Sequence, residues 1–295
     1  MNSPARNPYI EEVVGRYVSL DIDGTANRVY FEEAGEGIPL VCLHTAGSDS
    51  RQYRHLLADS AVTQHYRVLA FDLPWHGKSL PPTGWWEQEY LLTTDRYIDT
   101  VRAFCERLNL VDPVVLGCSM AGSLVLEIAR RHPDEFRGVI GLSGASTVKG
   151  RFHDWPLAPD INSNQVVPSW VSGLMAPTSP EESRREVWWE YSQGGPGIYR
   201  GDTYFYSNDL DLRGREHEID TSQCSVHLLT GEYDYACTAD ETEATITAIP
   251  GATGGRMTGI GHFPVTENYP VFREYLTPAL NRIRSAAHTS PTTTH

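Results

Sequence analysis

VVLGCSMAG (residues 114–122) joins an apolar run, typical of a buried β-strand, to a tight turn of small residues. A helix-like segment, SLVLEIARR, begins at residue 123. A serine nucleophile is held at this kind of strand-to-helix turn, and its neighbours are small because a bulky side chain would collide with the adjoining strand and helix. The turn therefore predicts that the Ser119 hydroxyl projects out of a sheet, which makes Ser119 a candidate nucleophile.

The turn departs from the usual Gly-x-Ser-x-Gly pattern at one position. Ala121 stands where the last glycine belongs, and Gly122 follows it. Alanine is nearly as small as glycine, so the steric requirement is still met. The alternative interpretation is that Ser119 is the N-cap of an ordinary helix that follows a buried strand. The turn alone leaves both interpretations open.

Composition and charge limit the class of protein. The 295 residues are 40% hydrophobic, enough for a large core in one domain or in one domain with a cap. There is no run of 18 apolar residues, and residues 1–8 carry no apolar signal segment, so we expect a cytoplasmic protein. The net charge of −14 disfavours nucleic acids and anionic membranes as partners. A small-molecule substrate is expected, and a homodimer is left open.

The five cysteines are scattered along the chain and show no metal-ligand spacing. In a chain without an export signal, such cysteines are expected to be reduced and packed rather than bridged. The sequence accordingly predicts no metal site and no cofactor.

Strand-like and helix-like segments alternate along most of the chain. Strands are predicted at residues 17–22, 27–32, 39–44, 66–71, 114–118, 136–143, 225–231 and 254–259, with a hairpin turn at Asp23-Gly24. Helices are predicted at residues 51–59, 91–108, 123–131, 239–249 and 271–286. Alternation of this kind predicts an α/β fold with a mostly parallel central sheet and helices on both faces.

The alternation fails between residues 150 and 220, where tryptophan and tyrosine are mixed with proline and glycine. We interpret this stretch as an inserted helical cap that separates two parts of the core, residues 1–149 and 221–287, with a flexible tail at 288–295. Most of its aromatic residues are expected to form the cap's own core. Some must face the sheet and line a cleft, and the candidates are Trp170, Trp188 and Trp189.

Five short segments together resemble the α/β-hydrolase fold superfamily, in its lipase/esterase-like, cap-bearing form. They are LHTAG at residues 43–47, FDLPWHGKS at 71–79, the turn at Ser119, LTGEYD at 229–234, and GHFP at 261–264 followed by Glu267. The segments occur in the order found in that family. The resemblance covers residues 15–285 and implies an α/β-hydrolase fold with a cap.

The chemistry of a serine nucleophile requires two partners. A base must take the hydroxyl proton as the serine attacks a carbonyl, and the pKa of histidine suits this role. A carboxylate must hold the imidazole in the correct tautomer. The family's chain order, Ser then Asp or Glu then His, implies a triad of Ser119, Asp234 and His262. The less favoured carboxylates are Glu232, Asp209 and Asp211.

The resemblance implies an oxyanion hole made by the backbone N–H groups of Met120 and Ala46. Thr45 replaces the glycine that the family has beside its loop histidine. Because threonine does not readily adopt a positive φ, the loop is expected to follow a different path. The Thr45 hydroxyl is then a further candidate donor to the oxyanion or to the substrate.

A second departure from the family is Trp75, which stands where glycine is common. Trp75 is expected either to cover the sheet edge or to shape the acyl pocket. His44 and His76 are expected to be structural residues around the cleft, as their equivalents in the family are. The candidate pocket residues are therefore His44, Thr45, Trp75, Trp170, Trp188 and Trp189.

Three functions remain open. The first is a serine esterase or lactonase that acts on a small, partly apolar molecule through an acyl-enzyme. The second is a carbon–carbon hydrolase of a ring-fission diketone, for which the candidate carboxylate-binding residues are Arg184, Arg185, Arg200, Arg213 and Arg215. The third is a non-catalytic binder of small ligands, which an intact triad disfavours. Epoxide hydrolases and haloalkane dehalogenases are disfavoured because they have an aspartate at the elbow, whereas acyl transfer stays open.

Overall fold

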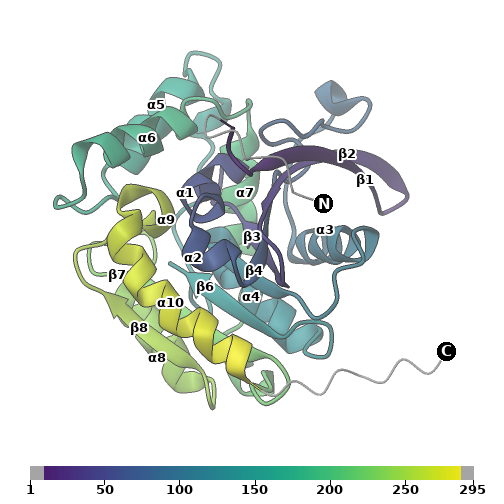
Figure 1. The fold of residues 1–295 in the computed structure, drawn as a ribbon. Coiled ribbons are helices and arrows are strands. Elements are labelled where there is room, and N and C mark those ends of the chain that lie inside the picture. Colours follow the sequence, from purple (N-terminus) through teal and green to yellow (C-terminus); the bar gives the residue numbers. More distant parts are fainter. Residues whose placement is uncertain (1–9, 287–295) are drawn as a thin grey trace.

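The computed structural model describes residues 10–286, and an eight-stranded sheet lies at the centre of that part of the chain (Figure 1). The strand order is β1-β2-β4-β3-β5-β6-β7-β8. The first two strands are antiparallel to their neighbours and all later pairs are parallel, which confirms the predicted mostly parallel sheet. The strands are β1 Val14–Ile22, β2 Thr25–Ala34, β3 Ile38–Leu43, β4 Tyr66–Phe71, β5 Val114–Cys118, β6 Gly138–Leu142, β7 Ser225–Gly231 and β8 Thr253–Met257. The tail predicted at 288–295 lies outside the described residues.

The hairpin between β1 and β2 forms at the predicted turn. Asp23 and Gly24 both have positive φ, 52° and 72°. Two such residues in a row make a type I′ turn, whose twist matches that of the strands on either side. The hairpin extends the sheet at one edge, away from the strands that carry the candidate site residues.

Helices cover both faces of the sheet, as predicted, and each face has its own apolar core. On one face, side chains such as Phe104 from α3 and Leu124 from α4 are fully buried. On the other, Leu56 from α1 and Phe272 from α10 are fully buried. The helices are α1 Arg54–Leu57, α2 Ser60–Thr63, α3 Thr94–Arg107, α4 Met120–Arg131, α5 Ser163–Ser172, α6 Glu181–Tyr191, α7 Ile198–Tyr204, α8 Ala239–Ala248, α9 Pro264–Glu267 and α10 Tyr269–Ser285.

The helix predicted at residues 91–108 begins three residues later than expected. Thr93 caps it, because its side chain accepts a hydrogen bond from the Arg96 N–H. Asp209 from a distant part of the chain also binds the first turn, through the Thr94 N–H at 2.6 Å. The sequence pattern continues past the cap, so periodicity alone places the start too early.

Three helices, α5, α6 and α7, lie between β6 and β7 in the chain, within the stretch interpreted as a cap. Figure 1 shows α5 and α6 side by side at one end of the molecule. They share a small apolar core that includes Val171, Val187 and Tyr191, and Phe263 from the loop after β8 joins it. This part of the chain is therefore packed directly onto a loop that carries a candidate catalytic residue.

The parallel strands bring the candidate site residues to one edge of the sheet. Thr45 follows β3, Ser119 follows β5, Asp234 follows β7 and His262 follows β8. The carboxyl ends of parallel strands meet at the same edge, where open α/β sheets bind their ligands. The topology thus assembles the site from loops that are far apart in the sequence.

Candidate active site

Ser119 occupies a strained turn between β5 and α4. Its φ of 60° and ψ of −117° lie outside the regions that residues other than glycine usually adopt. Neighbouring backbone leaves no room for larger side chains: a Cβ on Gly117 would lie 2.3 Å from the Ala121 carbonyl oxygen, and one on Gly122 would lie 2.1 Å from that of Leu142. The turn is therefore a nucleophile elbow in its geometry, and Gly122 is the residue that packs against β6.

Ser119, His262 and Asp234 form a continuous hydrogen-bonded chain. The Ser119 Oγ atom lies 2.8 Å from His262 Nε2, and His262 Nδ1 lies 2.7 Å from Asp234 Oδ2. All three residues are at most 4% exposed. This arrangement lets Nε2 accept the hydroxyl proton while the carboxylate holds the other nitrogen protonated.

The loop after β7 distinguishes Asp234 from the alternative carboxylates. Its Oδ1 atom accepts hydrogen bonds from the N–H groups of Ala236 and Cys237, at 2.8 and 3.0 Å, which aims Oδ2 at the histidine. Glu232 is exposed and accepts from the Gly259 N–H instead. The two remaining carboxylates are also bound elsewhere, Asp209 to Thr94 and Asp211 to Arg213.

Two backbone N–H groups on loops at the carboxyl edge of the sheet are available to a ligand. Within residues 10–286, neither the Met120 N–H nor the Ala46 N–H has a hydrogen-bond partner. Met120 is the first residue of α4, whose N-terminal N–H groups favour negative charge. These two groups have the chemistry that an oxyanion requires.

Thr45 does not adopt a positive φ; the left-handed residue of this loop is Gly47, with φ of 72°. Both polar groups of Thr45 are engaged. Its N–H donates to Gln52 at 2.9 Å, and its hydroxyl lies 2.5 Å from the Tyr191 hydroxyl. The structure thus commits the Thr45 hydroxyl to α6.

His44 lies beneath the same loop rather than in a cleft. Its Nδ1 atom donates to the Thr45 carbonyl, and its Nε2 atom accepts from the Leu73 N–H. Burial, together with the nearby charge of His76, lowers the pKa of His44 to about 4. A neutral imidazole is therefore fixed here by one donor and one acceptor.

Trp75 adopts a left-handed φ of 80°, the conformation that the glycine common at this position would favour. The indole ring contacts Trp85 edge-on, with centroids 6.0 Å apart, and Tyr90 at 5.3 Å. Trp75 thus packs into an aromatic group formed with the segment before α3.

The three tryptophans predicted to line a pocket lie elsewhere. Trp188 and Trp189 are 45% and 49% exposed, and Trp170, which is 37% exposed, stacks on Trp155. On α6 the buried positions are Val187, Glu190 and Tyr191, so the two tryptophans fall on the outer side of the helix. The expectation that Trp188 and Trp189 face the sheet and line a cleft is wrong for this reason.

Tyrosines take the place of those tryptophans near the site. Tyr191 contacts Phe263, which in turn contacts His262. The Tyr206 hydroxyl donates to the Ser143 carbonyl at 3.2 Å and also interacts with the Ser119 side chain. The spacing of Val187 and Tyr191 by one helical turn is the sequence signal that identifies the inner side of α6.

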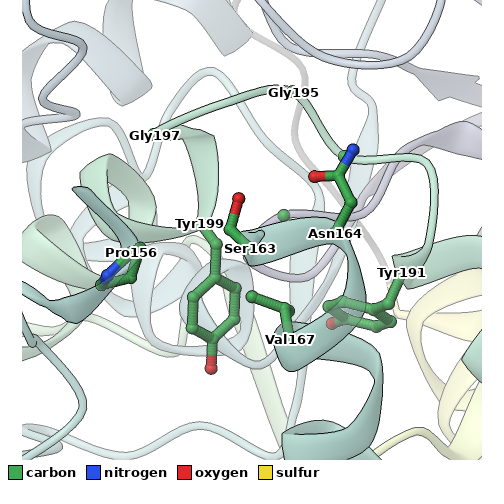
Figure 2. A pocket seen from close by; sticks show the side chains of 10 residues that line it. Pro156, Ser163, Asn164, Val167, Tyr191, Gly195, Gly197 and Tyr199 are labelled. Carbon is green, nitrogen blue, oxygen red and sulfur yellow. The ribbon is translucent and has the colours of Figure 1, made fainter. Parts of the chain in front are cut away.

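A pocket of about 10 Å³ lies between α5, α6, α7 and the loop after β3. It has room for about one water molecule. Figure 2 shows Tyr191 and Tyr199 on its wall together with Val167 from α5. Gly47, the neighbour of Ala46, also lines it. Side chains of α5, α6 and α7 therefore pack closely over the loop after β3, which carries the free N–H group of Ala46.

Within the described residues, no cluster of His, Cys, Asp and Glu has the arrangement of a metal site. The five cysteines are buried as free thiols. No described helix has both the length and the apolar character needed to cross a membrane.

Comparisons with known proteins agree with the fold. A family model described as the alpha/beta hydrolase fold matches residues 38–184. A 2-hydroxy-6-oxo-6-(2'-aminophenyl)hexa-2,4-dienoic acid hydrolase from Metapseudomonas resinovorans is 27% identical over 52% of this chain and 50% of its own. The chain spans about half the length of the curated relatives that it matches.

Solved structures match over nearly the whole chain at low identity. An enol-lactonase from Burkholderia xenovorans LB400 has a TM-score of 0.75 at 19% identity, covering 90% of this chain and 100% of its own. An esterase from Thermogutta terrifontis has a TM-score of 0.74 at 19% identity, covering 92% and 100%. These likenesses and the strand order show the α/β-hydrolase fold. By the family match, the chain belongs to the α/β-hydrolase fold superfamily.

Proposed function

We propose that this protein is a serine hydrolase that cleaves an ester or lactone of a small, partly apolar molecule. The observation that carries the proposal is the hydrogen-bonded chain from Asp234 through His262 to Ser119, with the serine held in a strained turn. Strain of this kind persists where the surrounding structure enforces it, and it is often part of a mechanism.

In the proposed mechanism, His262 Nε2 takes the proton of Ser119 as Oγ attacks the substrate carbonyl. The charge that develops on the carbonyl oxygen is stabilised by the N–H groups of Met120 and Ala46. His262 then gives its proton to the leaving alcohol, and an acyl-enzyme remains on Ser119. Water attacks this ester with the same histidine as base, which releases the acid and restores the serine. Asp234 stabilises the imidazolium in both steps.

The proposal also assigns the helices between β6 and β7 to a cap over the site. The support for this role is the contact of Tyr191 and Tyr199 with the loop after β3. Small-molecule sites are concave and mostly apolar, and a few placed polar groups in their lining provide specificity.

A second candidate is a carbon–carbon hydrolase that uses the same three residues on a diketone bearing a carboxylate. The five arginines predicted to bind that carboxylate are all paired within the protein: Arg184 and Arg185 with Glu181, Arg200 with Asp154, Arg213 with Asp211, and Arg215 with Glu218. Arg151 instead contacts Tyr199, and it has no carboxylate partner within residues 10–286. The dienoic acid hydrolase that matches half of the chain also favours this candidate.

Labelling with a fluorophosphonate tests the proposal. Wild type should be labelled at Ser119 and should hydrolyse short p-nitrophenyl esters, and Ser119→Ala should lose both properties. The matched control is Ser123→Ala, which removes a buried serine inside α4 that accepts a hydrogen bond from the Ala145 N–H. Wild-type ester hydrolysis by Ser119→Ala would disprove the role of this serine. Comparing ester cleavage with the disappearance of a coloured dienoate separates the two candidate reactions.

A further inference from the structure

The carboxylate of Asp202, on α7, is fully buried and receives hydrogen bonds from three separate parts of the core. Its Oδ2 atom accepts from the Gly47 N–H at 2.7 Å and lies 2.9 Å from His76 Nε2. Its Oδ1 atom accepts from the Tyr90 hydroxyl at 2.8 Å. A buried carboxylate is costly unless such donors surround it, so the arrangement is a specific link between α7 and the core.

One of these donors belongs to the loop proposed to form the oxyanion hole. The Gly47 nitrogen lies in the peptide that begins at Ala46, and a peptide bond is planar. Holding the Gly47 N–H toward Asp202 therefore fixes that plane and restricts the backbone of Ala46. The free N–H of Ala46 is then directed by a side chain that is itself fully buried.

α7 also holds Gly47 by packing. A Cβ on Gly47 would lie 2.9 Å from the ring of Tyr199, so that ring lies directly against the glycine. Tyr199 and Asp202 are three residues apart and thus share a side of the helix. One turn of α7 therefore supplies both the Tyr199 ring contact and the Asp202 hydrogen bond that hold the loop after β3 in its conformation.

The charge of His76 keeps this carboxylate in place. Both ring nitrogens of His76 face acceptors, the Pro74 carbonyl at 3.0 Å and Asp202, and only the doubly protonated ring donates to both. Burial lowers the pKa of His76, but the charge and hydrogen bond of Asp202 outweigh it, so the pKa is raised. His44, whose ring is tilted against that of His76 with centroids 4.7 Å apart, is the neutral neighbour.

We propose that Asp202 is a positioning residue for the oxyanion hole, which makes the hole depend on α7. The inference rests on the proposed serine hydrolase function. It predicts that the loop after β3 is not fixed by the sheet alone, and that the helices between β6 and β7 contribute to the chemical step as well as to substrate choice.

The test compares Asp202→Asn with Asp209→Asn. Asp209 is the matched control because it also ties this segment to the core, through Thr94, yet has no contact with Gly47. Asp202→Asn should lower kcat for a p-nitrophenyl ester by about 10- to 100-fold, with little change in KM, because small displacements of reacting groups cost this much. Its affinity for a boronic acid that forms a tetrahedral serine adduct should fall by a similar factor. Asp209→Asn should lower Tm and leave kcat within about twofold.

If Asp202→Asn loses thermal stability as Asp209→Asn does but keeps kcat and boronic acid affinity, the residue is structural and the inference is wrong. If Asp202→Asn does not fold, His76→Gln replaces it, and kcat should fall about tenfold. An unchanged kcat in that variant overturns the inference. Failure of the proposed function is distinguishable, since wild type would then show no labelling of Ser119.

Discussion

The hydroxyl groups of Thr45 and Tyr191 lie 2.5 Å apart, in a buried contact between the loop after β3 and the end of α6. One hydroxyl donates and the other accepts, so the pair satisfies a polar group on each side of the junction. Thr45 precedes Ala46, whose N–H is proposed to bind the oxyanion. In this contact the Thr45 hydroxyl bonds to Tyr191, so we do not expect it to act as an oxyanion donor.

We expect Thr45→Val to reduce stability and to leave the chemistry intact. The variant leaves the buried Tyr191 hydroxyl without its partner, which costs about 1–3 kcal/mol. Because the Thr45 hydroxyl is already committed, kcat should stay within about threefold of wild type, well short of the loss expected for an oxyanion donor. Urea denaturation and ester hydrolysis measure the two quantities.

Tyr191→Phe supplies the control for this pair. It should cost a similar free energy, and the double variant should cost less than the sum of the two because no hydroxyl is then left unpaired. A roughly 100-fold fall in turnover for Thr45→Val would instead assign the threonine hydroxyl to the oxyanion hole.

The elbow predicts destabilising effects of very different size at two adjacent small residues. Gly122→Ala would place a methyl group against the Leu142 carbonyl of β6, so we expect a loss of about 3 kcal/mol or failure to fold. Ala121→Gly removes a methyl group and should cost about 1 kcal/mol or less, from helix propensity. The free energies of unfolding of the two variants provide the comparison. A Gly122→Ala protein as stable as Ala121→Gly would mean that β6 is able to move away from the turn.

The elbow also shows why so much of the fold is predictable from the sequence. Small residues around Ser119, strand-like runs bounded by turns, and the order of the segments are all set by local sterics and by the parallel topology. The family's chain order implies Asp234 and His262, and the structure has them on the loops after β7 and β8. Helix ends are less predictable, since Thr93 and Asp209 fix the start of α3 by hydrogen bonds that the periodicity of the sequence does not reveal.

The cap is where prediction from sequence is weakest. Tryptophan content indicates an aromatic lining but not which side of α6 faces the site, so it favours the exposed Trp188 and Trp189 over Tyr191. No pattern in the sequence predicts the role of Asp202, because long-range packing brings its partners Gly47 and His76 to it. Contacts of that kind depend on the assembled fold.

Arg151 is expected to select substrates that carry a carboxylate. Its side chain is hydrogen-bonded to Tyr199, and Tyr199 lines the pocket beside Gly47. Arg151→Ala should raise KM about tenfold or more for a p-nitrophenyl monoester of a dicarboxylic acid, since a charge-assisted bond contributes about 1.5–3 kcal/mol. KM for p-nitrophenyl butyrate should not change.

Arg213→Ala is the control for this experiment, because Arg213 is an exposed arginine paired with Asp211. It should leave KM unchanged for both esters. Equal effects of Arg151→Ala on the charged and the neutral ester would contradict a carboxylate site and indicate a packing role for this arginine.

Glu267 makes the protein's free energy of unfolding depend on pH. Burial raises the pKa of this carboxyl to about 8, although the N–H groups of Gly261 and Ala176 hydrogen-bond to it and act in the opposite direction. The folded state then holds a proton that the unfolded state releases near its ordinary value of 4.5. The resulting stabilisation is fully present below that value and is lost as the pH rises from there through about 8.

Relative to Glu267→Gln, wild type should therefore be most stable at pH 4 to 5 and should lose a few kcal/mol of that advantage by pH 9, as measured by urea denaturation at each pH. Glu232→Gln is the matched control, since Glu232 accepts the Gly259 N–H in the same region from an exposed position and should give no such slope. A wild type that gains stability over Glu267→Gln as the pH rises would show that the two N–H donors prevail and that the buried carboxylate is ionised. Because Gly261 precedes His262, that result would also place a fixed negative charge beside the proposed catalytic base.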